Sequence, residues 1–151
     1  PSLTNFIKTF IQNYNNISTF DNQPDIPRII ITRGDANAIS GSINISGIDW
    51  KGQYVTETIS ITGGEVTNYG NVAFMKVLLA NGYNASPGNL SLGIGNKIGL
   101  LKQAIGCDLI NPVIKVKKNQ TDINVPAYDF VYNTINLDSI ANGDSFSILY
   151  L

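Results

Sequence analysis

The sequence predicts an all-β fold, an antiparallel β-sandwich or small barrel, with an amphipathic helix or arm at its N-terminus. The two halves of residues 39–64 each alternate between apolar and polar on either side of a turn, as a half-buried strand pair requires. Beyond them, short apolar segments are separated by Gly, Asn and Pro clusters, which favours several short strands. Residues 1–14 instead have a helical spacing. We expect an arm over 1–25 and a single β domain over 26–151, a length that supports its own core.

The amphipathic arm has apolar residues at i, i+3, i+4, i+7, i+8 and i+11, one stripe of a helix. These residues are Leu3, Phe6, Ile7, Phe10, Ile11 and Tyr14. Ser2 suits the N-cap position. A helix this short is marginal in water, so it needs a surface on which to pack. The surface is either the protein's own sheet or a neighbouring subunit, and both alternatives stay open. All six residues are therefore interface candidates.

Residues 15–28 follow as a linker, because Pro24 and Pro27 force extended backbone before them. The stretch 39–64 then predicts a β-hairpin, with Asp49 and Gly52 at the first and fourth positions of a type I turn. Its inward residues are Ile39, Ile43, Ile45, Val55, Ile59 and Ile61. Trp50 at the tip is an interface candidate, since Trp is enriched among interface anchors. The alternative is that its ring folds back over its own hairpin, and the sequence favours neither.

The other expected strands are 29–32, one beginning over 72–79, 90–92, a hairpin of 113–118 with 121–125, an extended 128–137, and 145–151. Residues 93–99 have the glycine spacing G-x-G-x-x-x-G, not the G-x-G-x-x-G of dinucleotide sites, and no helix–strand alternation surrounds them. The sequence thus predicts no nucleotide site. Arg33-Gly34-Asp35 falls at an expected turn, and we interpret this adhesion tripeptide as a chance match.

Composition argues against several functions. The chain has 10 basic and 11 acidic residues, so it has no net positive charge. Its one basic cluster consists of Lys115, Lys117 and Lys118. Nucleic-acid binding needs more clustered basic residues than this, and we therefore expect no nucleic-acid partner. No apolar run approaches the roughly 20 residues of a membrane span. The chain has no His, and its single Cys107 allows no disulfide within the chain. We therefore expect no enzyme, no catalytic residue, no cofactor and no metal site.

Glu57 is the one carboxylate on the inward face of the hairpin. An inward charge has to be paired or lie at the rim of the core. We expect a structural ion pair, with Arg28 or Arg33 as the partner, rather than a catalytic role.

Four segments together carry a family resemblance: the Pro-Arg before the first apolar strand, the hairpin with its T-E-T-I run, the strand after it, and the L-G-I-G-N-K-I-G-L loop. The motif residues are Pro27, Arg28, Gly47, Asp49, Gly52, Thr56, Glu57, Thr58, Ile59, Gly63, Ala73, Phe74, Lys76, Val77, Gly93, Gly95, Lys97, Gly99 and Leu100. This pattern resembles a family of small tailed-phage virion structural proteins. The chain departs from the family pattern at Asn96 and Leu101, where Asp and Pro are usual.

The resemblance implies a virion protein, assembled in the host cytoplasm. The function we favour is a capsid decoration protein, forming a homotrimer and bracing the major capsid protein, with no nucleic-acid or membrane partner. A tail or baseplate component is the first alternative. The second is a carbohydrate-binding adhesion module, with Trp50, Tyr54 and Tyr69 as stacking candidates.

Overall fold

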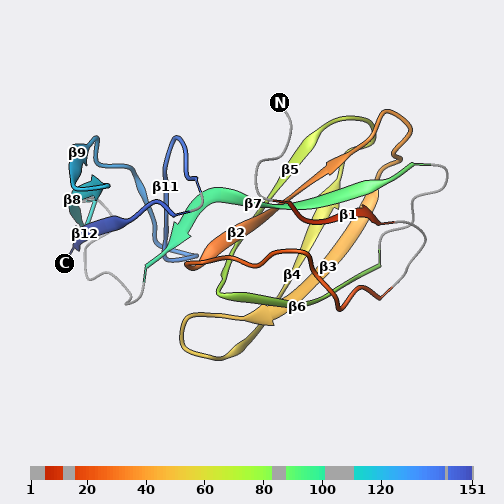
Figure 1. The fold of residues 1–151 in the computed structure, drawn as a ribbon, viewed down its shortest axis with the longest axis horizontal. Helices are drawn as coiled ribbons and strands as arrows, with labels where there is room; N and C mark the ends of the chain where they lie inside the picture. The colour runs from red at the N-terminus through yellow and green to blue at the C-terminus, as the bar shows by residue number, and fades with distance from the viewer. Residues whose placement is uncertain (1–5, 12–15, 83–87, 101–110, 142, 151) are drawn as a thin grey trace.

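The computed structural model describes residues 6–11, 16–82, 88–100, 111–141 and 143–150 of the 151-residue chain, with only the backbone described for 6–11. The all-β prediction is confirmed: the described residues form antiparallel sheets and no helix (Figure 1). The strands are β1 (Phe6–Ile11), β2 (Arg28–Gly34), β3 (Gly41–Ile48), β4 (Tyr54–Ile61), β5 (Thr67–Phe74), β6 (Lys76–Asn81), β7 (Leu90–Gly99), β8 (Val113–Lys118), β9 (Thr121–Ile123), β10 (Tyr128–Asp129), β11 (Thr134–Asn136) and β12 (Phe146–Tyr150).

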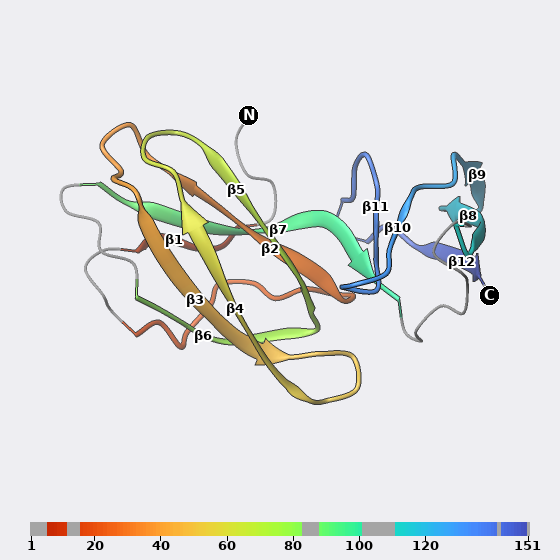
Figure 2. The same ribbon diagram turned by 180° about the vertical axis from the view of Figure 1, so that it is seen from behind.

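Two layers enclose the larger core. The first is the three-stranded sheet β4-β3-β6, and the second is the sheet β10-β11-β7-β2-β5, to which β1 is added at β7. Figure 2 shows β3 and β4 crossing in front of β2, β5 and β7 as a curled half-barrel. The first core lies between the layers and consists of Ile30, Ile43, Ile45, Ile59, Ile61, Phe74, Val77, Ala80, Leu90, Leu92 and Ile94. Ile17 and Phe20 of the linker pack against it.

The predicted central hairpin is confirmed, and it is the pair β3–β4, in register from Gly41↔Ile61 to Ile48↔Tyr54. Its inward residues Ile43, Ile45, Ile59 and Ile61 are buried and its Thr-rich face is exposed. Ile39 is the exception, since it precedes the strand and is 39% exposed. The inward assignment of Ile39 was therefore wrong.

The predicted N-terminal helix is wrong over residues 6–11, which form the strand β1. β1 pairs antiparallel with β7, where Phe6 is opposite Gly93 and Ile11 is opposite Leu90. An unpaired edge of β7 would leave backbone N–H and C=O groups without partners, and an extended segment satisfies them where a helix cannot. The rest of the predicted helix, with Leu3 and Tyr14, lies outside the described residues.

The sequence predicts one strand near residues 72–79, but the structure has two strands there, β5 and β6, separated by Met75. The N–H of Met75 donates to the carbonyl oxygen of Ile48 at 2.8 Å, where the chain passes from the β2–β5 layer to the β3–β6 layer. Alternation alone does not reveal such a crossing, because the residues on both sides of it are apolar.

The C-terminal lobe, residues 111–150, has its own sheet, β12-β8-β9, and the small hairpin β10–β11. The predicted hairpin at 113–125 is confirmed as β8–β9, whose turn residues Asn119 and Gln120 both have positive φ. A second core lies here: Ile98, Leu100, Val113, Val116, Tyr128, Ile135, Leu137 and Ile140. Figure 1 shows β7 running from the larger part of the molecule to the smaller, so one strand contributes to both cores.

Candidate docking groove

A groove of about 280 Å³ lies where the tip of the β3–β4 hairpin approaches the turn between β10 and β11. We call it the aromatic groove, because Trp50, Phe130 and Tyr132 line it from its two sides. Its other lining residues are Asp49, Lys51, Val55, Val72, Ala73, Gly99, Leu100, Val131 and Asn133. The groove thus brings together segments that are some eighty residues apart in the chain.

The hairpin tip that carries Trp50 is held by one carboxylate. Oδ1 of Asp49 accepts from the N–H groups of Lys51 at 2.8 Å and of Gln53 at 2.9 Å. The N–H of Gly52 donates to the carbonyl oxygen of Asp49 at 3.0 Å, as the predicted turn requires, and Gly52 has φ +78°. The ammonium of Lys51 lies 5.1 Å from the centre of the Trp50 ring, within cation–π range. The tip therefore presents Trp50 from a fixed turn.

The facing turn is held in the same way. Oδ1 of Asp129 accepts from the N–H groups of Val131 at 2.9 Å and of Tyr132 at 3.1 Å. The ring of Phe130 meets that of Tyr128 edge to face, with 4.7 Å between the centroids. Phe130, Val131 and Tyr132 are 36%, 82% and 42% exposed. Three consecutive exposed apolar residues on a turn that is already ordered lose little entropy when a partner covers them.

The base of the groove is the edge strand β5, which bulges beside Val72. Residues 70–72 stand opposite Ile30 of β2 alone. The bulge leaves N–H groups of β5 outside the ladder, and the carboxylate of Glu57 in β4 accepts hydrogen bonds from them. Oε1 accepts from the N–H of Asn71, and both carboxylate oxygens accept from the N–H of Val72 at 3.3 Å. One carboxylate thus closes the half-barrel between β4 and β5 without a backbone ladder.

The expected arginine partner of Glu57 was wrong, although its inward position was right. The ion pairs among the described residues do not include Glu57, and its half-buried carboxylate is satisfied by backbone N–H groups. Burial raises the pKa of Glu57 above its ordinary value of 4.5, and the N–H bonds and Lys97 oppose that rise. A Cβ at position 70 would lie 2.5 Å from Oε2 of Glu57, so Gly70 admits the carboxylate.

Arg28 and Arg33 are engaged elsewhere. Arg28 is fully buried, and its Nε donates to the carbonyl oxygen of Gly95 at 2.9 Å. Its Nη1 lies 4.0 Å from Oδ1 of Asp25, and neither Nη1 nor Nη2 has a hydrogen-bond partner among the described residues. Burial lowers the pKa of Arg28, against the attraction of Asp25 and Asp144. Arg33 donates to Oγ1 of Thr67 at 3.2 Å.

Of the predicted interface residues, the structure places Trp50 in the aromatic groove. Phe6, Ile7, Phe10 and Ile11 lie in β1 at the edge of β7. The stacking candidates Tyr54 and Tyr69 are 65% and 64% exposed and do not line the groove.

Sequence reasoning missed Phe130, Val131 and Tyr132, which lie in a stretch expected to be extended. The available signal was Asp129, because an Asp side chain often accepts a hydrogen bond from the backbone N–H two residues later and so favours an Asx-type turn.

Among the described residues, no three or more His, Cys, Asp or Glu side chains gather closely enough to hold a metal ion. Within the same ranges, no helix is long and apolar enough to cross a membrane. Comparisons with protein-family models, with curated proteins and with solved structures found no match to this chain.

Proposed function

We propose that this chain is a structural protein of a tailed-phage virion, most favourably a capsid decoration protein that braces the major capsid protein as a trimer. The observation that carries the proposal is the aromatic groove: Trp50 and the Phe130–Tyr132 turn line one groove from two sides, on turns held by Asp49 and Asp129. Aromatic residues on preordered turns are characteristic of protein contact sites. Such a protein would work by adding buried surface between neighbouring shell subunits.

The placement of the motif residues supports the same proposal. Nε of Arg28 donates to the carbonyl oxygen of Gly95, and the N–H of Gly99 donates to the carbonyl oxygen of Pro27 at 2.9 Å. Glu57 of the T-E-T-I run accepts from the strand that carries Ala73 and Phe74. The motif segments therefore contact one another and form the scaffold of the groove. Motif residues Asp49, Ala73, Gly99 and Leu100 line part of it, and Phe130, Val131 and Tyr132 come from outside the motif.

Counting copies of the chain per purified particle tests the proposal. A decoration protein occupies the shell in hundreds of copies, whereas a tail or baseplate component is present in a few dozen or fewer. Quantitative mass spectrometry against the major capsid protein gives the ratio, and an image of the particle locates the chain. Absence of the chain from purified particles contradicts both virion assignments.

A variant pair tests the groove itself. Trp50→Ala should weaken binding to particles that lack the protein by about tenfold or more, because a truncated interface Trp removes a central anchor. Its melting temperature should stay close to that of the wild type. Tyr54→Ala is the matched control, since Tyr54 is an exposed aromatic on the same hairpin outside the groove. Equal losses for both variants would argue against the aromatic groove as the contact.

Carbohydrate binding is less favoured, because the Lys51 ammonium lies over the Trp50 ring on which a sugar would stack. If the isolated protein bound to a glycan array and Trp50→Ala abolished that binding, carbohydrate binding would be favoured over the structural role.

A further inference from the structure

The half-barrel has two seams, and the chain closes them in different ways. Glu57 closes the seam between β4 and β5. The other seam lies between β6 and the edge of β7 that faces away from β2. The N-terminal part of the chain fills it, because β1 pairs with β7 and Ile17 pairs with Ala80 of β6. Figures 1 and 2 show residues 16–27 running beside β6.

The two halves of this N-terminal segment are held unequally. Ile17 and Ala80 exchange backbone hydrogen bonds of 2.8 and 2.9 Å. The side-chain amide of Gln23 donates to the carbonyl oxygen of Val77 at 2.9 Å and accepts from its N–H at 2.8 Å. β1, by contrast, pairs with β7 in an irregular register, with two shifts within its six residues. An interrupted edge ladder opens at a lower free energy than a regular one, so β1 is the half that can leave its place.

The edge of β7 that β1 occupies, residues 90–93, needs a strand, and we call it the β1 seat. Leu90 and Leu92 are fully buried in the first core, and without β1 the backbone beside them would present unpaired N–H and C=O groups. Residues 90–95 contain no charged residue and no proline, so this edge lacks the usual features that prevent strand addition. The segment that fits the seat is β1 itself, and every further copy of the chain carries it.

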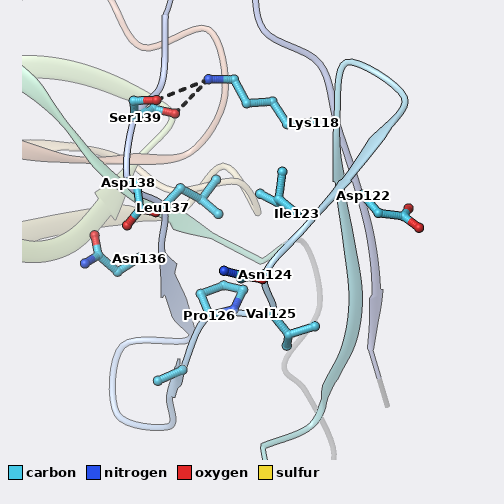
Figure 3. A pocket seen from close by; sticks show the side chains of 11 residues that line it. Lys118, Asp122, Ile123, Asn124, Val125, Pro126, Asn136, Leu137, Asp138 and Ser139 are labelled. Atoms are coloured by element: carbon cyan, nitrogen blue, oxygen red, sulfur yellow. Dashed lines mark hydrogen bonds between the residues drawn. The ribbon is translucent and has the colours of Figure 1, made fainter.

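The C-terminal lobe has a hollow of about 760 Å³ but no comparable seat (Figure 3). Its lining residue Leu137 is buried in the second core, and Ile123 packs against that core. Nζ of Lys118 donates to the carbonyl oxygen of Ser139 at 3.0 Å, as Figure 3 shows, and lies 2.9 Å from Asp144. The lysine and the apolar side chains of this hollow are thus satisfied within the chain.

We propose that β1 of one copy binds the β1 seat of a second copy, so that neighbouring copies hold one another by exchanged strands. The residue pairs between β1 and β7 are the same in either arrangement, so the exchange costs little. Residues 12–16 join β1 to the anchored Ile17 and reach at most about 22 Å, which limits how far the accepting seat lies from the donor. Each copy gives one strand and receives one, so head-to-tail exchange closes a ring, and three copies would form the proposed trimer.

This inference does not depend on the virion assignment. A chain that is absent from virions would still exchange β1, and a virion protein could bind its shell through the aromatic groove alone. Its tests therefore use the purified full chain and do not require particles.

Disulfide trapping between two chains tests the exchange. Phe6 and Gly93 are opposite each other in the β1–β7 ladder, where a disulfide can form. One chain carries Phe6→Cys and the other Gly93→Cys, both with Cys107→Ser, and the two are mixed and oxidised. We expect the covalent pair to be about tenfold more abundant than with Ser60→Cys, an exposed position of β4, in place of Gly93→Cys. Equal yields with the two partners would overturn the inference.

A single chain that carries both Phe6→Cys and Gly93→Cys, again with Cys107→Ser, gives an independent decision. Exchange predicts covalent oligomers on a non-reducing gel, since each disulfide then joins two copies. Pairing within one chain predicts oxidised monomer alone, and that result would overturn the inference.

Two variants of Lys8 test the exchange without added cysteines. Sedimentation of the wild-type chain should show oligomers. Lys8→Pro should lower their fraction about tenfold, because proline cannot continue the ladder, whereas Lys8→Ala, the matched control, keeps the N–H and should not. A wild type that stays monomeric up to millimolar concentration would contradict the exchange. So would loss of oligomers with Trp50→Ala but not with Lys8→Pro, which would assign the contact between copies to the aromatic groove.

Discussion

The two cores of this molecule share β7 but are stabilised differently. The first core is a sandwich of isoleucine, leucine and phenylalanine side chains, most of them fully buried between two layers. The second is surrounded by half-buried residues such as Phe146 and Ile148, and its loops are tied by polar side chains. Asp144 alone bonds to Asn119, to Lys118 and to the N–H of Ala141.

Exposed apolar residues occur in both regions. The sandwich exposes Tyr54, Tyr69 and Met75, and the C-terminal lobe exposes Val125, Val131 and Leu149. Polar ties hold loops in place without covering their apolar side chains, so those side chains stay available to a partner. The two regions therefore differ in how they are stabilised: the sandwich has a fully buried apolar core, and the lobe has a less buried core with polar ties between its loops.

The largest expected effect is at the centre of the sandwich. Phe74→Ala should lower the free energy of unfolding by about 4 kcal/mol, because Phe74 is fully buried and its removal leaves a cavity. Phe146→Ala, the same change in the lobe, should cost about 2 kcal/mol, because Phe146 is only half-buried. Urea unfolding of both variants measures the difference. Equal costs would contradict the division between the two regions.

A smaller effect is expected at the closure of the half-barrel. Glu57→Ala should cost about 2 kcal/mol, since it leaves the N–H groups of Asn71 and Val72 without an acceptor, and Glu57→Gln, which keeps one oxygen, about 1 kcal/mol. The folded chain keeps the Glu57 proton at pH values where the unfolded chain has lost it. The contribution of Glu57 to the free energy of unfolding therefore falls as pH rises through its raised pKa. Urea unfolding across pH 4 to 7 should show the gap between wild type and Glu57→Gln narrowing as pH rises. A stability difference that widens as pH rises would contradict the raised pKa of Glu57.

The smallest effect is expected in the lobe, with the opposite sign. Hydrogen bonds from Ala141, Asn119 and Lys118 lower the pKa of Asp144 to about 2. The stabilisation from Asp144 is therefore complete above its ordinary value of 3.8 and is lost as pH falls toward 2. Asp144→Asn should flatten this acid loss in thermal melts. Asp138→Asn, at an exposed side chain in the same lobe, should not, and a flattening with both variants would remove Asp144 as the cause.

Local patterns in the sequence predicted the parts of the fold that depend on local chemistry. Alternation located β3 and β4, Asp49 and Gly52 located their turn, and Asn119-Gln120 located the β8–β9 turn. The helix predicted for the arm was wrong over residues 6–11, because a run such as Phe-Ile-Lys-Thr-Phe-Ile satisfies a helical stripe. Its strand form depends on an open edge of β7, which distant residues supply.

The sites were less predictable, for the same physical reason. The inward position of Glu57 follows from alternation, but its partners depend on a bulge of β5 that only the register between β2 and β5 creates. Trp50 was identifiable as a large aromatic at a predicted turn, whereas Phe130 and Tyr132 resembled strand residues.

β7 lies antiparallel to β2 from Ile98↔Arg28 to Leu90↔Gly34, and it continues into the lobe. A force that pulls the lobe along the axis of β7 would shear the β2–β7 ladder. In shear, the hydrogen bonds of the ladder share the load, whereas in peeling they would break one after another. A partner bound to the lobe would thus transmit tension along β7 into the β2–β7 ladder.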